Sequence, residues 1–248
     1  MEIDPFQLAA VMAIFILAGT IKGVIGLGLP TLSIGLMSVW LPIEQAAAIL
    51  VLPAFLTNVW QMWNGDALIA LIRRLWPTML GIVVGTLVSA GFVIGANAWL
   101  APIILGTILV VYSAFGLIGA EIRVSPGVEP MLGPVVGLTT GLINGATAIF
   151  VLPTLPYLQG LRLGRDQLIQ AIGISACVSI TALALGLGLN GKLGTDAFVP
   201  GVIALIAALA GMAFGQKIRS RLSVEAFRRW VFLGLFALGC AMVVRAIL

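Results

Sequence analysis

The feature that most constrains this chain is a series of long stretches without any charged residue. Residues 75–120 contain no Asp, Glu, Lys or Arg, and the same holds for 23–43, 45–65, 130–161, 167–191 and 197–216. A helix needs about 20 apolar residues to cross the hydrocarbon core of a bilayer, so residues 75–120 are long enough for two crossings. These stretches predict a polytopic, all-α integral membrane protein that contacts the lipid bilayer.

The composition excludes several other classes. Only 9% of the residues are charged and the mean hydropathy is +1.18, whereas a soluble domain carries about 25% charged residues. There is no His, and the two Cys residues lie in separate apolar stretches, so zinc, haem and Cys–His sites are excluded and no cofactor or metal is expected. Most basic residues lie in short segments between apolar stretches, which indicates membrane topology and not a nucleic-acid partner.

Glycine and proline interrupt two apolar stretches at matching places in the two halves of the chain. The first half has Gly19-Thr20-Ile21-Lys22-Gly23, Pro30-Thr31-Leu32 and Glu44-Gln45, and the second has Gly141-Leu142-Ile143-Asn144-Gly145, Pro153-Thr154-Leu155 and Asp166-Gln167. Broken hydrophobic segments at corresponding positions are the best sequence pointer to the substrate site of a transporter. The alternative is that the glycines only allow close helix packing, and the repetition favours the site.

The distribution of basic residues predicts how the broken stretches, 6–40 and 131–159, are folded. If each returns to its starting side as a hairpin, ten of the 13 Lys and Arg residues lie on one face, and Lys192 and Arg245 lie on the other. If 131–159 crosses once, seven Lys and Arg residues lie on one face of the membrane and five on the other. Cytoplasmic loops carry the excess of Lys and Arg, so the hairpin arrangement is favoured.

This arrangement predicts two inverted-topology repeats, each made of a broken-helix hairpin and three transmembrane helices. The six full spans are expected at 43–63, 75–95, 97–118, 166–188, 197–216 and 229–247. The first membrane repeat is residues 1–118, the cytoplasmic linker is 119–130, and the second membrane repeat is 131–248. The protein is expected in the cell inner membrane, with both termini on the periplasmic or extracellular side.

The broken helices predict an anion site. A short helix that begins near Thr31 or Thr154 would point its N-terminus, which carries partial positive charge, at a cavity. Gly26 and Gly28 would let the ligand approach the backbone closely. Lys22 is the one charged residue well inside a predicted span, where an unpaired cation costs about 2.5–3.5 kcal/mol. It is therefore expected to meet an anionic ligand, or else to reach the membrane interface.

Further polar residues complete the predicted substrate site. Asn144 stands at the position that matches Lys22, and Thr147 follows in the second break. Asn58 and Gln170 lie in the spans after the two broken stretches and are costly to bury without a partner. Glu44 and Asp166 are expected in the first turns of their helices, where an acid favours the helix dipole, with a role in coupling as the alternative.

The run Gly19-x-x-x-Gly23-x-x-Gly26-x-Gly28-x-Pro30, repeated more loosely as Gly141-x-x-x-Gly145 and Pro153, resembles the TauE/SafE sulfite-exporter family of membrane permeases. The length, the two-half layout and the central polar linker resemble that family too. The resemblance implies transport of small sulfur-containing anions, such as sulfite, sulfoacetate and toluenesulfonate. It implies neither the direction of transport nor the coupling ion nor the oligomeric state.

Together these features predict a secondary transporter that binds a small anion near the membrane midplane, between the two hairpins, and works by alternating access. An anion channel and a membrane scaffold subunit without a substrate are the alternatives. An enzyme is not expected, because the sequence has no His and no carboxylate in mid-span. The chain has no G-x-x-x-x-G-K-[ST] nucleotide-binding loop, so it is not itself an ATP-driven pump.

Overall fold

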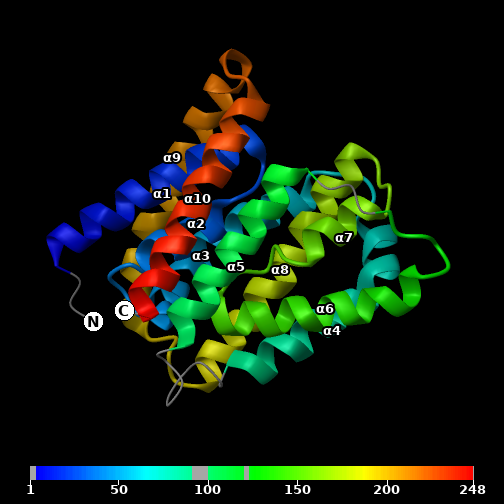
Figure 1. Ribbon diagram of the computed structural model, residues 1–248, viewed down its shortest axis with the longest axis horizontal. Coiled ribbons are helices and arrows are strands. Elements are labelled where there is room, and N and C mark those ends of the chain that lie inside the picture. Colours follow the sequence, from blue (N-terminus) through cyan, green and yellow to red (C-terminus); the bar gives the residue numbers. More distant parts are fainter. Residues whose placement is uncertain (1–3, 91–99, 120–122, 248) are drawn as a thin grey trace. The chain divides into compact units, whose positions relative to one another are not determined.

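The computed structural model describes residues 4–90, 100–119 and 123–247, and every regular element in these ranges is helical. Figure 1 shows the α-helices, which are α1 (Pro5–Ile25), α2 (Leu29–Met37), α3 (Ile43–Trp63), α4 (Leu68–Ala90), α5 (Ala101–Ile118), α6 (Glu129–Thr147), α7 (Thr154–Gly160), α8 (Arg165–Leu189), α9 (Phe198–Ile218) and α10 (Val224–Ile247). Two 3₁₀ helices, η2 (Thr195–Ala197) and η3 (Arg219–Arg221), border α9. The prediction of an all-α protein is confirmed for these residues.

Helix lengths follow the same order twice along the described chain. A long helix, α1 or α6, is followed by a short one, and three long helices come next. The short helices have nine residues in α2 and seven in α7. They come directly after the breaks expected from glycine and proline.

In the part of the chain that the structure describes, seven helices are long and apolar enough to cross a membrane: α1, α3, α4, α5, α8, α9 with its extension to Arg221, and α10. Six of them overlap the expected full spans, of which residues 91–95 and 97–99 lie outside the described residues, and α1 is the seventh. The matching first helix of the second half, α6, is not among them because its four glycines, three threonines and Asn144 lower its hydropathy. The folding of 6–40 and 131–159 as hairpins stays a prediction.

One helix start differs from the expectation. α4 begins at Leu68, so Arg73 and Arg74 lie within the helix and not in a loop before residue 75. The Arg74 guanidinium donates two hydrogen bonds to the Glu129 carboxylate, with Nε–Oε1 2.6 Å and Nη2–Oε2 2.7 Å. A bidentate pair of this kind is strong and directional, and it holds the start of α6 against α4 beyond the apolar stretch.

The chain forms two compact units, and each unit combines parts of both halves. Unit 1 comprises Met1–Ala54, Trp99–Gly119 and Gly191–Leu248, and unit 2 comprises Phe55–Ala98 and Ala120–Asn190. In unit 1, α1 packs along α9 and α5 packs along α10; in unit 2, α4 packs along α6 and α8. The units are thus defined by packing. The division into repeats at 1–118 and 131–248 is a statement about sequence and stays a prediction.

The glycine pair of α1 packs against α9 within unit 1. A Cβ atom added at Gly19 or Gly23 would collide with the backbone oxygens of Ala208 or Met212. The contact is reciprocal, because a Cβ at Gly211 of α9 would collide with the backbone of α1. Small residues let two helix backbones approach closely in a membrane, so these glycines have a packing role.

Unit 2 repeats this contact with different helices. A Cβ atom at Gly141 or Gly145 of α6 would collide with α4 backbone oxygens, and one at Gly81 or Gly85 of α4 would collide with the backbone of α6. Gly19, Gly23, Gly141 and Gly145 therefore have the packing role that was the alternative, and a site marked by their repetition stays a prediction. Repeated glycines mark a repeated helix contact.

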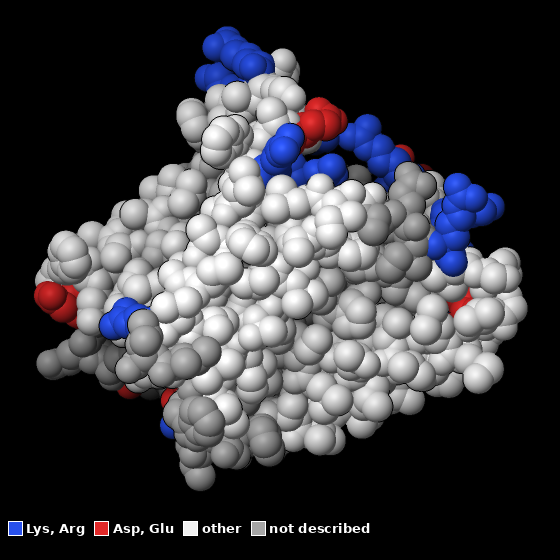
Figure 2. Space-filling view, viewed as in Figure 1, with Lys and Arg blue, Asp and Glu red and all other residues white. Residues whose placement is uncertain are grey.

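Basic side chains gather at one end of unit 1. Figure 2 shows basic side chains gathered at the end of unit 1 where α9 turns into α10. The sequence places Lys217, Arg219, Arg221, Arg228 and Arg229 there. Most of the visible face is uncharged (Figure 2), as lipid contact requires.

Candidate functional site

The break in unit 1 is built by glycines that adopt left-handed backbone conformations. α1 ends at Ile25, and Gly26 (φ 89°) donates its N–H to the carbonyl oxygen of Lys22 at 2.7 Å. Gly28 (φ 102°) precedes the first residue of α2. Such φ values are readily adopted only by glycine. A Cβ atom at Gly26 would have no neighbour within 4 Å, so the break has open space beside it.

Three polar side chains lie buried at this break. Lys22 is in the last turn of α1 and is 5% exposed, and Thr31 and Ser33 of α2 are fully buried. The Oγ1 atom of Thr31 and the Oγ atom of Ser33 have no hydrogen-bond partner among the described residues. A buried hydroxyl without a partner costs about 1–3 kcal/mol. The break therefore combines unused donors with a positive charge, a combination that suits an anion.

The break in unit 2 has a similar backbone and different surroundings. α6 ends at Thr147, and Ala148 (φ 59°) donates its N–H to the carbonyl oxygen of Asn144 at 2.7 Å. Residues 148–152 are all buried. The hydroxyl of Thr154, at the start of α7, forms a hydrogen bond with Thr140 at 2.7 Å. The helix start expected at Thr154 is confirmed, and its hydroxyl already has a partner.

Asn144 is fully buried and uses both of its amide protons within unit 2. Its Nδ2 atom donates to Thr86 Oγ1 at 3.1 Å and to the carbonyl oxygen of Ser179 at 2.8 Å. The Oδ1 atom has no partner among the described residues. The alternative amide orientation is excluded because the Ser179 carbonyl cannot donate a proton. The unused atom of Asn144 is thus an acceptor.

Gln170 joins the loop between α3 and α4 to α8. Its Oε1 atom accepts from the N–H of Ala67 at 3.0 Å, and its Nε2 atom donates to the carbonyl oxygens of Met62 (2.9 Å) and Gly65 (2.8 Å). These three bonds use every proton of the amide and account for its burial. A role of Gln170 in anion binding stays a prediction.

The predicted site residues divide evenly between the units, with Lys22, Gly26, Gly28 and Thr31 in unit 1 and Asn58, Asn144, Thr147 and Gln170 in unit 2. The Thr147 hydroxyl donates to the Ile143 carbonyl oxygen at 2.8 Å and accepts from the Ile149 N–H at 3.3 Å. Asn58 is 4% exposed in α3. The acids behave as helix-start residues, because Glu44 and Asp166 lie in the first turns of α3 and α8.

Sequence reasoning missed three hydroxyls that contribute to the breaks. Ser33 lies two residues after Thr31 in the same short helix, and its proximity in sequence was a usable signal. Thr140 precedes Gly141 directly, and Thr86 lies in the middle of the charge-free stretch 75–120. Nothing in the sequence shows that Thr140 pairs with Thr154 or that Thr86 accepts a bond from Asn144.

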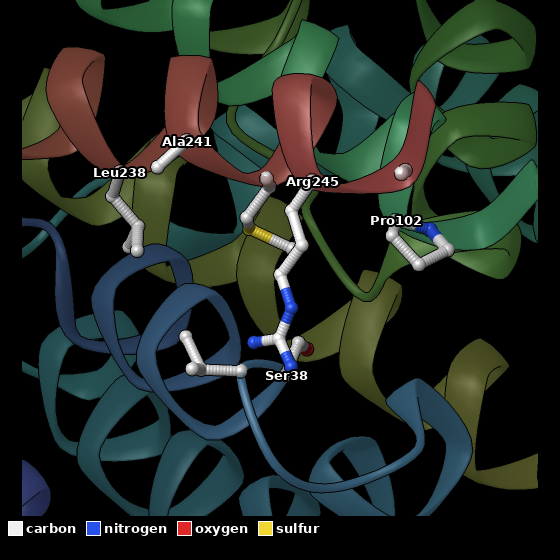
Figure 3. Close-up of a pocket in the computed structure, with 8 residues that line it drawn as sticks. Ser38, Pro102, Leu238, Ala241 and Arg245 are labelled. Atoms are coloured by element: carbon white, nitrogen blue, oxygen red, sulfur yellow. The ribbon is translucent and has the colours of Figure 1, made fainter. Parts of the chain in front are cut away.

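A separate cavity of about 410 Å³ lies in unit 1 between the C-terminal end of α2, the start of α5 and the end of α10. Most of its lining is apolar, from Val39, Pro102, Leu238, Ala241, Met242 and Ala246, and the polar side chains are Ser38 and Arg245. Figure 3 shows the Arg245 side chain extending from α10 toward Ser38. None of the predicted site residues lines this cavity.

Comparison with known proteins gives one positive result. Neither the curated proteins nor the solved structures contain a match to this sequence. A protein-family model described as "Sulfite exporter TauE/SafE" matches residues 11–242, which include both breaks and every predicted site residue. The chain therefore belongs to the TauE/SafE sulfite exporter family of membrane transporters.

Proposed function

We propose that the protein is a secondary transporter that carries a small sulfur-containing anion across the inner membrane by alternating access. The substrate is sulfite or an organosulfonate such as sulfoacetate, the class that the family name indicates. The observation that carries this proposal is the break in unit 1, where the buried Thr31 and Ser33 hydroxyls have no partner at the start of α2. Lys22 supplies positive charge at the end of α1.

The chemistry of this break suits a sulfur oxyanion. A sulfite or sulfonate group presents several oxygen acceptors around one negatively charged centre. The first N–H groups of a helix have no partner within the helix and attract anions, and α2 has nine residues, enough for two full turns. The left-handed backbone at Gly26 and Gly28 turns the chain from α1 into α2 without a side chain that would fill the approach.

The four predicted residues of unit 2 are further candidates for contacts to the anion. Asn144, Thr147 and Gln170 already donate their protons to protein oxygens. They would have to exchange those bonds for bonds to the anion during the transport cycle. Their contribution near the membrane midplane is therefore the part of the proposal that variants must test.

The pairing of helices supports a two-repeat plan. If residues 1–118 and 131–248 are equivalent, α1 corresponds to α6 and α4 corresponds to α9. The packing of α1 along α9 in unit 1 then has its counterpart in the packing of α6 along α4 in unit 2. The pairing of α5 with α10 is its own counterpart. Repeats that exchange helices in this way, with opposite orientation in the membrane, underlie alternating access in many transporters.

Two measurements test this proposal. Thermal unfolding of the purified protein with sulfite, sulfoacetate, toluenesulfonate, sulfate and acetate shows which anion binds the folded state, because such a ligand raises Tm with its concentration. The double variant Thr31→Val/Ser33→Ala should lose most of the shift. Ser113→Ala is the matched control, since its buried hydroxyl is bonded to the Leu109 carbonyl oxygen at 2.6 Å in α5.

Uptake into proteoliposomes distinguishes the alternatives. A transporter gives uptake that saturates and that preloaded substrate accelerates by counterflow. Flux that neither saturates nor shows counterflow would indicate an anion channel. A protein with no thermal response and no flux for any anion of the panel would behave as a scaffold subunit, and the proposal would be abandoned.

A further inference from the structure

The last turns of α1 and α6 are equivalent in backbone and different in charge. Gly26 and Ala148 each donate an N–H to the carbonyl oxygen four residues earlier, so Lys22 and Asn144 occupy the same place. The last carbonyl groups of a helix carry partial negative charge. α1 has one basic residue, Lys22, in its last turn, and α6 has none in its last turn.

Asn144 presents the feature that a cation would use. Its Oδ1 atom is buried and unpartnered, and the contacts of Nδ2 to Thr86 and Ser179 fix the amide orientation. A buried amide oxygen without a partner costs about 1–3 kcal/mol. A donor or a cation would remove that cost, and an anion would increase it.

The hydroxyl groups next to Asn144 do not satisfy this oxygen. The Ser179 Oγ atom donates to the Ser175 carbonyl oxygen at 2.8 Å, and the Thr147 Oγ1 atom donates to the Ile143 carbonyl oxygen at 2.8 Å. Ser89 of α4 donates to the Gly85 carbonyl oxygen at 3.0 Å. Each of these three protons is thus directed to a backbone carbonyl, and the Oγ1 atom of Thr86 accepts from Asn144 Nδ2 at 3.1 Å.

We propose that a sodium ion binds at the C-terminal end of α6, with Asn144 Oδ1 and α6 backbone carbonyls as ligands, and that it is the coupling ion of the transporter. The ion would give the end of α6 the positive charge that Lys22 gives to the last turn of α1. Helix C-terminal ends and unwound carbonyls are the groups that bind coupling Na⁺ in broken-helix transporters. The coupling role rests on the proposed transport function, whereas the binding site does not.

The ligand chemistry favours a monovalent cation. Divalent Ca²⁺ and Mg²⁺ are usually held by carboxylates, and the described residues contain no cluster of three or more His, Cys, Asp or Glu side chains. Asn144 supplies a neutral oxygen, as do backbone carbonyls. One Na⁺ that enters with one monoanion also leaves the net charge of the loaded protein unchanged.

The first test uses the unmodified protein without any sulfur anion. Thermal unfolding is measured in NaCl, KCl and choline chloride at equal ionic strength, and we expect Tm to rise with NaCl concentration only. Equal Tm values in the three salts would overturn the site, and an equal rise in KCl would overturn the assignment to sodium. Because no anion substrate is needed, this failure is distinguishable from failure of the transport proposal.

The second test measures coupling. Anion and sodium must raise each other's affinity by the same factor, typically about 5- to 150-fold, so sulfite uptake should rise about ten-fold with NaCl outside. Sodium that raises Tm without any effect on uptake would overturn the coupling role. Sulfite binding without a sodium response would leave the proposed function standing and overturn this inference.

Asn144→Lys provides a tethered cation as in α1. We expect this variant to lose the sodium-dependent change in Tm and to take up sulfite at a rate independent of sodium. Asn190→Leu is the matched control, because the Asn190 amide caps α8 through a bond to the Gly186 carbonyl oxygen at 2.8 Å. An unchanged sodium response in Asn144→Lys would overturn the assignment. If this variant fails to fold, the salt series on the unmodified protein decides.

The cavity beside Arg245 carries a second, independent inference. Its body is apolar, and its polar groups are the Arg245 guanidinium and the buried Ser38 Oγ atom, which has no partner among the described residues. Val39 in its lining is 44% exposed, and the next residue, Trp40, is 40% exposed. Exposed Trp is enriched at the level of the lipid headgroups. We infer that the cavity binds the phosphate and the first part of one acyl chain of a membrane phospholipid.

Lipid retention tests this second inference. In native mass spectrometry of the detergent-purified protein, phosphatidylglycerol should be retained in preference to phosphatidylcholine, since its net charge is negative. Arg245→Gln should lower this retention roughly ten-fold, the value of one charged hydrogen bond, and Arg229→Gln at the other end of α10 should not. Equal losses in both variants, or displacement of the lipid by inorganic phosphate alone, would overturn the lipid assignment.

Discussion

The helix breaks of the two units both begin with a left-handed residue, Gly26 or Ala148, and differ in length and chemistry. In unit 1, residues 26–28 separate α1 from α2, and the Thr31 and Ser33 hydroxyls near the start of α2 are buried with no partner among the described residues. In unit 2, residues 148–153 separate α6 from α7, and the buried group without a partner is the amide oxygen of Asn144. A repeated sequence can thus keep the turn of the chain and still offer donors at one break and an acceptor at the other.

Single substitutions account for this difference. Thr140 lies directly before Gly141 and bonds to Thr154, whereas the residue directly before Gly19 is Ala18, which has no hydroxyl. Thr31, which matches Thr154, therefore has no such partner. The last turn of the first helix also contains lysine in unit 1 and asparagine in unit 2, so the break in unit 1 alone has a basic residue in that turn.

The largest effect on stability is expected in unit 2 for Gln170→Leu. The substitution removes three hydrogen bonds to partly buried backbone groups, and at about 1 kcal/mol each it lowers the free energy of unfolding by about 3 kcal/mol. Chemical unfolding in detergent measures this loss. Sulfite-dependent stabilisation that persists in the variant would remove Gln170 from the anion site, and its disappearance would place Gln170 in it.

The next effect concerns binding in unit 1. Lys22→Asn makes the last turn of α1 like that of α6, and the loss of a charged contact worth about 2 kcal/mol lowers anion affinity roughly thirty-fold. Titration calorimetry with sulfite and sulfoacetate measures the change, and circular dichroism checks the helical content. An unchanged Kd would show that Lys22 does not contact the anion. The exchange of lysine for asparagine would then make no difference to anion binding at the two breaks.

The positions of the breaks could be predicted from sequence because glycine and proline disfavour a continuous helix locally. The length of the apolar stretches predicted long helices at the six expected spans for a similar reason, since the thickness of a bilayer sets helix length. The acids Glu44 and Asp166 also lie in the first turns where a local rule places them. These features depend on residues that are close together in the sequence, so the sequence alone could predict them.

The roles of side chains at the breaks depended on distant partners and could not be read in this way. Gly19 and Gly26 are the same residue type in the same apolar stretch, yet Gly19 packs against Ala208 and Gly26 has open space beside it. Asn144 belongs to the predicted substrate site, and both of its amide protons are donated to Thr86 and Ser179. Residues in other helices determine which atom of the side chain is left without a partner.

A smaller effect separates the matching threonines. Thr154→Val leaves the Thr140 hydroxyl without its partner and should lower the free energy of unfolding by about 1 kcal/mol. Thr31→Val removes a buried hydroxyl that has no partner, so stability should be unchanged or higher while anion affinity falls. Thermal unfolding with and without sulfite measures both quantities. Equal destabilisation by the two variants would contradict the difference between the breaks.

The smallest effect tests the left-handed residue with which both breaks begin, Gly26 in unit 1 and Ala148 in unit 2. Gly26 has open space for a methyl group but a φ of 89°, so Gly26→Ala should lower the free energy of unfolding by about 1 kcal/mol through backbone strain alone. Ala148→Gly relieves the same strain at φ 59° and gives up a buried methyl group. These two effects largely offset each other, so the free energy of unfolding should change by less than about 0.5 kcal/mol.

Gly234→Ala in α10 is the control, since its methyl group also meets open space and an ordinary helical alanine should stabilise by about 0.5–1 kcal/mol. Stabilisation of Gly26→Ala to the same extent as Gly234→Ala would show that the break in unit 1 is not held in the left-handed conformation, and the backbone equivalence of the two breaks would no longer hold.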